Sequence, residues 1–470
     1  MLPFIIRKNI KMTKKLSYIT AFVIVLSSCT KFLDIKPYGE TIPHTADEFS
    51  ALLHAHLQNI DEGEETIFGN IESSLDVEAV SDNLEASLTS YPSGNYFPLY
   101  IGNRLNQKQN HYKNLYAIIR DCNIVIGNIE EKESSLAKNV LGTAYAMRGV
   151  CYYNLLRDFA DPCWNNLSGN GVPLVTEFDM EATPVRSTIA ETVSRAENDM
   201  KTAISYNISE KVFRFNSDVM EGYLARLYFW SGDFGKAAEY ARKVLAKYPL
   251  LDRENFKTMM DSRYKMTPVT EMLMKSCIRT EKSMQYDGYI SNIKARPVSA
   301  RFIKLFTEKE KDIRYEISFS KMRTNQKNPF ACLRSGEMQL ILAESLYHTG
   351  DEPGALKALN DLRRNRISDY TDLTSDTLPE VNTSNLIKTD AKGNPLTPLL
   401  SAILCERQKE LYMEGDRWYE LKRNGRPEFW VAKQGRKYTT MRFMYTFPLP
   451  IQDIELVDGL VQNPGYDKVE

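Results

Sequence analysis

The sequence has almost no net charge. It carries 60 lysine and arginine residues against 61 aspartate and glutamate residues, so the formal net charge over 470 residues is −1. A chain without a strong positive field cannot attract nucleic acid or an anionic lipid surface by charge alone. We therefore expect no nucleic-acid partner.

Histidine and cysteine are also scarce. Among the five histidines, His54 and His56 have a spacing that points them to different sides of a helix, which is a weak metal pattern. The seven cysteines include no Cys-x-x-Cys pair, which excludes a zinc ribbon and supplies no disulfide framework. Cys122 and Cys151 lie in apolar helical patterns and are predicted to be buried thiols. The sequence predicts neither a metal site nor a cofactor.

Beyond residue 30 no apolar run approaches the ~20 residues needed to cross a bilayer. At the N-terminus, however, the basic "RKNIKMTKK" is followed by the apolar "LSYITAFVIV" and by "LSSC", which is the pattern of a signal peptide. "LSSC" resembles the bacterial lipobox, in which cleavage precedes the cysteine and the thiol receives a diacylglycerol. We therefore predict a signal peptide over residues 1–28, lipidation at Cys29 and a tether over 29–45. Met12 opens a complete signal of this kind, so Met1 and Met12 are both candidate start residues.

Helical periodicity dominates the rest of the chain and predicts an all-α fold. In "NHYKNLYAIIRDCNIVIGNIEE" (110–131) apolar residues recur at i, i+3, i+4 and i+7. "AKNVLGTAYAMRGVCYYNLLRDFA" (137–160) follows it and contains four small residues that permit close helix approach, namely Gly142, Ala144, Ala146 and Gly149. These two segments are predicted to form a packed antiparallel pair.

A weak internal repeat relates residues 224–249 to residues 342–366. Both copies share an alanine and then Gly-Asp-x-x-x-Ala, with Gly232 aligned to Gly350. The first copy resembles a tetratricopeptide unit, but the separation of the copies excludes a tandem solenoid. Four less regular insertions, where we expect a binding surface, lie near 61–110, 160–185, 251–330 and 367–400.

The segment 399–430, "LLSAILCERQKELYMEGDRWYELKRNGRPEFW", is predicted to be one further helix. Its buried stripe is formed by Leu404, Arg407, Leu411, Trp418 and Leu421. The charged residues expected to pair along this helix are Glu406, Glu410, Glu414, Arg407 and Arg417. Glutamates paired with arginines keep a low pKa, which suits neither a general acid nor a tuned base, so we interpret this helix as structural.

Six segments in order resemble the SusD/RagB family of Bacteroidetes outer-membrane lipoproteins. They are "CTKFLDIKP", the pair "LYAIIRDCNIVIGNI" and "AYAMRGVCYYNLLRDFADP", "GVPLV", "EMQLILAESLYHTGDEPGALKALNDLRRNR", "ERQKELYMEGDRWYELKRNG" and "FPLPIQDIELVDGLVQNPGY". The resemblance runs from Cys29 to Tyr466. It implies a single SusD-like α-helical domain over 46–470 with long ligand-binding loop insertions. The tetratricopeptide-like helix pairs are then expected near 111–160, 218–249 and 335–366.

The resemblance also implies a location and a function. Such proteins are surface-exposed lipoproteins of the outer membrane, here anchored at Cys29. They bind an oligosaccharide, or in the RagB branch a peptide, without catalysis. They hand this ligand to a SusC-like TonB-dependent transporter, which they cover as a lid.

A glycan site needs flat aromatic faces flanked by hydrogen-bonding side chains. The loop "SDNLEASLTSYPSGNYFPLY" and two other segments have this character, and the candidate ligand residues are Asp82, Asn83, Tyr91, Asn95, Tyr96, Trp164, Tyr286 and Tyr289. In the family this loop usually includes a tryptophan, and none is present here. A simple glucan is therefore a doubtful ligand.

Two other function classes remain open. A glycoside hydrolase needs two carboxylates ~5–10 Å apart, and no nucleophile elbow, P-loop or HExxH motif accompanies such a pair here. A helical-repeat scaffold would bind only proteins. Binding of a small oligosaccharide or peptide argues against the scaffold, and product release from the oligosaccharide argues for the hydrolase.

Overall fold

The computed structural model describes nine stretches of the chain. They are residues 43–64, 67–85, 108–163, 166–179, 181–263, 265–277, 283–294, 296–433 and 436–466. The described residues from Thr45 onward belong to one compact unit. The predicted signal peptide and Cys29 lie outside the described residues.

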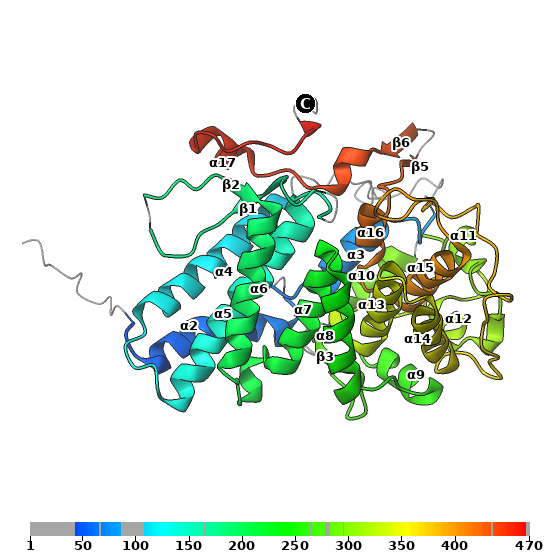
Figure 1. The fold of residues 1–470 in the computed structure, drawn as a ribbon, viewed down its shortest axis with the longest axis horizontal. Helices are drawn as coiled ribbons and strands as arrows, with labels where there is room; N and C mark the ends of the chain where they lie inside the picture. The colour runs from blue at the N-terminus through cyan, green and yellow to red at the C-terminus, as the bar shows by residue number, and fades with distance from the viewer. Residues whose placement is uncertain are drawn as a thin grey trace, which may run out of the picture. The chain divides into compact units, whose positions relative to one another are not determined.

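Helices make up most of the described chain, and the predicted all-α fold is confirmed (Figure 1). The helices with at least nine residues are α2 (Ala46–Glu62), α3 (Ile71–Ala79), α4 (Lys108–Asn128), α5 (Ser135–Phe159), α6 (Ile189–Ser205), α7 (Ser217–Ser231), α8 (Phe234–Lys247), α9 (Arg253–Asp261), α10 (Ser283–Lys294), α13 (Ser335–His348), α14 (Glu352–Arg364) and α15 (Pro398–Glu410). The shorter ones are α11 (Ala300–Ile303), α12 (Ile313–Ser318), α16 (Arg417–Arg423) and α17 (Ile451–Leu456). None of the described helices is long and apolar enough to span a bilayer.

The strands of the described chain form three short antiparallel pairs. These are β1 (Asn170–Pro173) with β2 (Arg186–Thr188), β3 (Met272–Lys275) with β4 (Cys332–Arg334), and β5 (Phe429–Lys433) with β6 (Arg436–Thr440). Each pair is two strands wide, so the strands join loops to helices and do not form a layer of their own.

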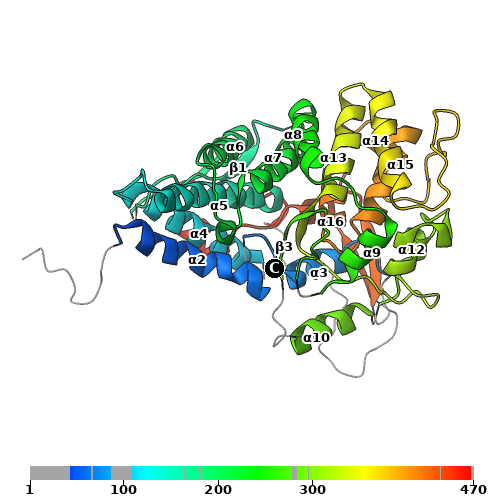
Figure 2. The same ribbon diagram turned by 90° about the horizontal axis from the view of Figure 1, so that it is seen from below.

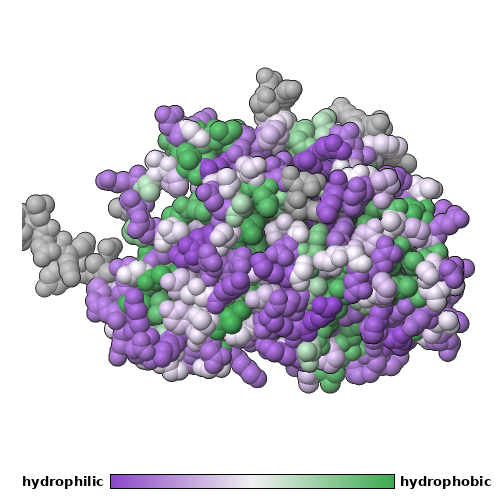
Figure 3. Space-filling model, in the orientation of Figure 1, coloured by the Kyte–Doolittle hydropathy of each residue, from purple (hydrophilic) through white to green (hydrophobic). Residues whose placement is uncertain are grey.

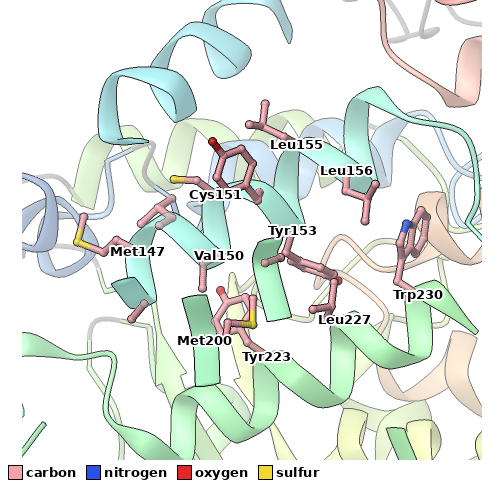
Figure 4. Packing of buried hydrophobic residues seen from close by; sticks show 14 of the residues in the cluster. Met147, Val150, Cys151, Tyr153, Leu155, Leu156, Met200, Tyr223, Leu227 and Trp230 are labelled. Atoms are coloured by element: carbon pink, nitrogen blue, oxygen red, sulfur yellow. The ribbon is translucent and has the colours of Figure 1, made fainter. Parts of the chain in front are cut away.

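The main hydrophobic core is centred on α5, which contacts α2, α4, α6 and α7. Figure 4 shows Val150 and Tyr153 of α5 directed toward Met200 of α6 and toward Tyr223 and Leu227 of α7. Cys122 and Cys151 have no exposed surface in this core, as predicted. The same helices lie side by side when the fold is seen from below (Figure 2).

Two glycines of α5 allow α6 and the residues after it to approach closely. A Cβ atom on Gly142 would lie 2.8 Å from the Cβ of Tyr206, and one on Gly149 would lie 3.1 Å from the carbonyl oxygen of Ala196. The sequence predicted that the small residues would serve the contact between α4 and α5. That contact exists, but the two glycines face α6 instead.

The internal repeat corresponds to two helix pairs with the same turn. Gly232 and Gly350 adopt φ values of 85° and 86°, a left-handed conformation that favours glycine. In both copies the next residue caps the second helix, since the carboxylate of Asp233 accepts from the Lys236 amide and that of Asp351 accepts from the Gly354 amide. The Gly-Asp pair that the two copies share is therefore explained by the geometry of this turn.

The segment 399–430 is not one helix, and that prediction is wrong. α15 ends at Glu410, and a turn with Met413 at φ 62° and Gly415 at φ 75° separates it from α16. The turn passes so close to α3 that a Cβ atom on Gly415 would lie 3.2 Å from the backbone of Ser74. The predicted apolar stripe is nevertheless buried, with Trp418 fully enclosed.

A network of buried ion pairs surrounds Glu410, and its partners are not those that the helix spacing predicted. Glu410 accepts hydrogen bonds from Arg314 at 3.1 Å, from Arg334 at 2.7 Å and from Arg366 at 3.0 Å. Arg334 and Arg366 also bind Glu271, at 2.8 Å and 3.0 Å. All five side chains are at most 2% exposed.

Two further glutamates extend this network along the same segment. Glu406 pairs with Arg314 and with Arg363, and Glu414 pairs with Arg334. Burial alone would raise the pKa of these carboxyls, but the arginines outweigh it. They hold the pKa of Glu410 well below its ordinary value and lower the pKa of both other glutamates. The predicted low pKa of these arginine-paired glutamates is confirmed, and their structural role stays a prediction.

Glu78 at the end of α3 shows the opposite behaviour. Burial raises its pKa from the ordinary value of 4.5 to about 7, although the Met413 amide and the Asn83 side chain donate to it. The hydrogen bonds reach only Oε1, while Oε2 is buried without a partner. A proton on Oε2 removes the charge from the interior, so Glu78 is neutral in the fold below about pH 7.

We expect Gly142→Ala to destabilise the protein by about 1–3 kcal/mol, because the added methyl collides with Tyr206 and Ile208. Gly127→Ala on α4 is the matched control, since nothing lies within 4 Å of its Cβ position. The control should be neutral or stabilising by about 0.5–1 kcal/mol, the usual gain for alanine in a helix. Urea unfolding of both variants measures the difference, and equal stability would contradict the close packing.

The buried Glu78 carboxyl predicts a pH-dependent stability. Because the folded state binds this proton more tightly than the unfolded state, its contribution is complete below about pH 4.5 and is lost as the pH rises through 7. Glu78→Gln should therefore flatten the decline in unfolding free energy between pH 5 and 8, by up to about 3 kcal/mol. Urea unfolding across this range tests it, and identical profiles for the two proteins would contradict it.

Candidate functional site

Two of the four predicted insertions, those near 61–110 and 251–330, are joined by backbone hydrogen bonds. Leu84 forms an antiparallel bridge with Val298. On either side of it the Glu85 amide donates to the carbonyl of Pro297 and the Ser299 amide donates to that of Asn83, both at 2.8 Å. Residues 83–85, the last described before position 86, are thus held against residues that follow α10.

A third segment completes this arrangement. The Val298 amide donates to the carbonyl of Arg323 at 2.7 Å, and the Arg323 guanidinium donates back to the carbonyl of Val298 at 2.9 Å. Phe319 and Asn325 pair across the turn that presents Arg323. We call the residues 83–85, 296–301 and 320–325 together with α10 the insertion face.

The insertion face rests on its own hydrophobic cluster. Its buried members are Ile71, Leu75, Ala79, Leu84, Ile290, Ile293, Val298, Phe302, Leu305, Phe306, Phe319, Tyr412 and Met413. They come from α3, α10, the meeting segments, α11 and the residues after it, Phe319, and the turn after α15. This cluster therefore fixes the base of the insertion face separately from the main core. The helices α3 and α10 also show that the insertions near 61–110 and 251–330 are less irregular than the sequence predicted.

The exposed side of the insertion face carries charged and flexible side chains. Glu85 pairs with Arg323 at 2.5 Å, and the side chain of Arg301 is 39% exposed. Burial would raise the pKa of Glu85, but hydrogen bonds from Arg323 and from the Ala300 amide outweigh it and lower the pKa. Met284 and Met322 are 86% and 87% exposed. Such a surface offers ionic hydrogen-bonding groups beside adaptable apolar contacts.

The candidate ligand residues fall into three groups. Asp82 and Asn83 are buried, because Asp82 binds Arg417 at 2.6 Å and the Asn83 side-chain amide binds Glu78 and Gln408. Their side chains support the insertion face from inside, and their predicted contact with a ligand stays a prediction. The side chains outside the described residues are those of Tyr91, Asn95, Tyr96, Trp164, Tyr286 and Tyr289. For Tyr286 and Tyr289 the structure gives the backbone position, on α10 within the insertion face.

A polar cavity of about 140 Å³ lies between α5, α7, α13 and the segment after α15. Oppositely charged side chains line it, in particular Arg157, Arg226, Arg407, Arg423, Asp158, Glu337, Glu414, Asp416 and Glu420. Most of these charges are already paired, for example Arg407 with Asp416 and Arg423 with Glu344. Its volume is well below the roughly 300–1,000 Å³ of usual ligand pockets, so an oligosaccharide does not fit there.

The cavity contains two carboxyls whose pKa values differ. Burial raises the pKa of Glu420 to about 7, whereas the pKa of Glu414 is lowered because Arg334 and Lys327 outweigh burial. Divergent carboxyls are the electrostatic requirement of a glycoside hydrolase. Here, however, Glu420 is 2% exposed and binds Arg417 at 2.8 Å. The space beside these carboxyls does not admit two linked sugar rings, which disfavours the hydrolase.

Sequence reasoning did not identify Glu85, Arg301 and Arg323 as site residues. They belong to no motif, and their only signal was their position in the insertions near 61–110 and 251–330. Among the residues that the structure describes, no group of three or more histidine, cysteine, aspartate or glutamate side chains could hold a metal ion.

Comparisons with known proteins match nearly the whole chain. A family model described as "Starch-binding associating with outer membrane" matches residues 31–229, and the model of the SusD family matches residues 225–466. No curated protein matches the chain significantly.

Solved structures have the same fold at low identity. A SusD superfamily protein from Bacteroides thetaiotaomicron is 21% identical with a TM-score of 0.69, covering 89% of this chain and 100% of that one. A putative sugar binding protein from Bacteroides vulgatus is 22% identical with a TM-score of 0.68, over 91% and 100%. A laminarin binding SusD-like protein is 17% identical with a TM-score of 0.58, over 90% and 100%.

The family resemblance seen in the sequence is thereby confirmed from two directions, by family models and by fold. The second family model alone spans more than half of the 470 residues. The chain belongs to the SusD/RagB family, whose members are carbohydrate-binding proteins associated with the outer membrane.

Proposed function

We propose that this protein is a cell-surface nutrient-binding lipoprotein. It captures glycan oligosaccharides and delivers them to a SusC-like TonB-dependent transporter in the outer membrane, with no catalysis of its own. Cys29 anchors it through a lipid, and residues 29–45 tether the helical domain to that anchor.

The observation that carries this proposal is the meeting of two insertions on one exposed face of a chain that belongs to the SusD/RagB family. Ligand sites concentrate on loops that a rigid scaffold positions. The insertion face satisfies this condition, since its base is held by the Leu84–Val298 bridge and by a separate hydrophobic cluster. Glu85, Arg301 and Arg323 supply hydrogen-bonding groups for sugar hydroxyls. Tyr91 and Tyr96 follow Glu85 closely in the sequence.

An exposed apolar surface supports the proposed contact with a SusC-like transporter. Large apolar side chains with roughly half or more of their surface exposed occur at the start of β2 and along α17 and the residues after it, namely Val185, Ile451, Leu456 and Val461. Figure 3 shows hydrophobic surface in this region of the molecule. Exposed apolar patches of this kind mark contacts with proteins or membranes, and we assign this one to the transporter.

A second candidate function is capture of a peptide, as in the RagB branch. Two observations favour it over an unsubstituted glucan. Met284 and Met322 expose flexible apolar side chains on the insertion face, which suit peptide side chains better than sugar hydroxyls. The loop over 86–107 also contains no tryptophan for stacking.

Calorimetric titration of the full chain tests the proposal, in a detergent whose headgroup carries no sugar. The panel contains plant, host and microbial glycans and a peptide digest. We expect heat with one glycan class, and we expect Arg301→Ala and Tyr91→Ala each to weaken that binding about tenfold through loss of a hydrogen bond or a stacking face. Arg242→Ala, an exposed arginine on α8, is the matched control and should leave binding unchanged.

Other outcomes distinguish the alternatives. Heat with peptides alone would replace glycan capture by the peptide function. Release of shorter sugars from the titrated glycan would show a hydrolase. Binding that Arg301→Ala and Tyr91→Ala leave unchanged would place the site elsewhere than the insertion face.

A further inference from the structure

A second cavity, of about 230 Å³, lies between α2 and α4. These helices contact each other and lie side by side in Figure 2. The cavity shares no residue with the insertion face. The lining residues that the structure describes include no lysine, arginine, aspartate or glutamate, so they offer no ion pair to a charged ligand. A neutral ligand is therefore the better match.

Two amide side chains in this lining make no hydrogen bond to the described part of the chain. Asn59 comes from α2 and Asn114 from α4, and neither side chain makes a hydrogen bond to any part of the chain that the structure describes. Each amide presents a carbonyl oxygen that accepts and an NH₂ group that donates. A ligand that only fills space would remove these groups from water without replacing their hydrogen bonds, which is unfavourable. The ligand must itself both donate and accept.

His56 adds an imidazole ring held in one orientation by a hydrogen bond. Its Nε2 lies 2.8 Å from Oδ2 of Asp121. Burial would raise the pKa of Asp121, but hydrogen bonds from His56 and Arg120 outweigh it and lower the pKa, so Asp121 is an ionised carboxylate that only accepts. Nε2 therefore donates to this carboxylate, and Nδ1 is the ring nitrogen left for a hydrogen bond with a ligand.

The remaining wall is apolar. Ile67, Leu115 and Ile118 are at most 5% exposed and form an apolar surface, and the small side chain of Ala117 leaves room beside them. A pyranose ring has one face of C–H groups and an edge of hydroxyls that both donate and accept. This combination matches an apolar wall facing two amides and one imidazole.

We propose that the cavity between α2 and α4 is a second carbohydrate site that binds one neutral sugar ring. Its volume, below the roughly 300–1,000 Å³ of usual ligand pockets, limits it to a single ring. It gives the protein a second contact with a polysaccharide, away from the insertion face, and so raises the avidity for long chains. The site does not depend on what the insertion face binds, because the two share no residue.

Saturation-transfer NMR on the full chain tests this site, in a detergent whose headgroup carries no sugar. The probes are the methyl glycosides of glucose, galactose, mannose and N-acetylglucosamine, with dialanine as the peptide comparison. We expect transfer to at least one glycoside. Asn59→Ala and Asn114→Ala should each weaken it about fivefold, through loss of one hydrogen bond. Ala117→Phe should abolish it by filling the cavity.

Two matched controls separate the cavity from general effects. Asn110→Ala removes an exposed amide from α4 outside the cavity, and Ala51→Phe adds the same bulk to the exposed side of α2. Both should bind as the unmodified protein does. Because Asn114 is exposed, its variant should fold normally, and a thermal melt checks this for every variant.

The proposal is overturned if no glycoside shows transfer, if only dialanine does, or if Ala117→Phe binds glycosides as well as the unmodified protein. Loss of glycoside binding in Arg301→Ala with retention in Ala117→Phe would assign the signal to the insertion face and also overturn it. Failure of the insertion face to bind oligosaccharides, with this site intact, would affect only the proposed main function.

Discussion

Glu410 is a buried carboxylate that three buried arginines share, and the rest of the domain depends on this arrangement. Arg314 comes from the third insertion, Arg334 from β4 and Arg366 from the end of the second repeat pair. Burying such charges is costly unless every one is paired and hydrogen-bonded. The network therefore fixes the third insertion relative to the helix pairs, because any displacement would leave a charge unpaired.

This constraint explains how a helical scaffold can carry a variable surface. Above the network, residues 296–301 and 320–325 return to meet residues 83–85, and a separate hydrophobic cluster supports them. The base is held by charge pairing and packing, so the loops it presents can change without loss of the fold. A binding protein of the SusD/RagB family needs this separation, since relatives only 17–22% identical keep the same fold.

The sequence alone predicted the local features well, because they depend on periodicity and turn chemistry. The apolar faces of α4 and α5, the left-handed glycines Gly232 and Gly350, and the buried Trp418 all follow from spacing within one element. Ion pairs between residues far apart in the chain leave no such pattern in the sequence. The partners of Glu410 lie 44 to 96 positions away, so helix spacing suggested neighbours such as Arg407, which instead binds Asp416.

The candidate site was less predictable for the same reason. Asp82 and Asn83 looked like ligand residues because polar side chains in a loop usually face solvent. Asp82 is instead buried in a hydrogen bond with Arg417, 335 positions later. Asn83 is buried in one with Gln408, 325 positions later. The groups that do reach the surface, Arg301 and Arg323, belong to no motif. The residue sequence thus identified the scaffold and the insertions, and only the fold shows which polar groups face outward.

The claim that the Glu410 network holds the third insertion in place is tested most directly by hydrogen–deuterium exchange. Glu410→Gln is compared with Glu316→Gln, which removes a charge from an exposed pair with Lys257. Breaking the network should cost about 3–5 kcal/mol, against about 1 kcal/mol or less for the exposed pair. We predict faster exchange in Glu410→Gln over residues 271–275 and 312–325, with α5 and α6 unchanged. Exchange that is unaltered there, or that rises equally throughout the chain, would contradict it.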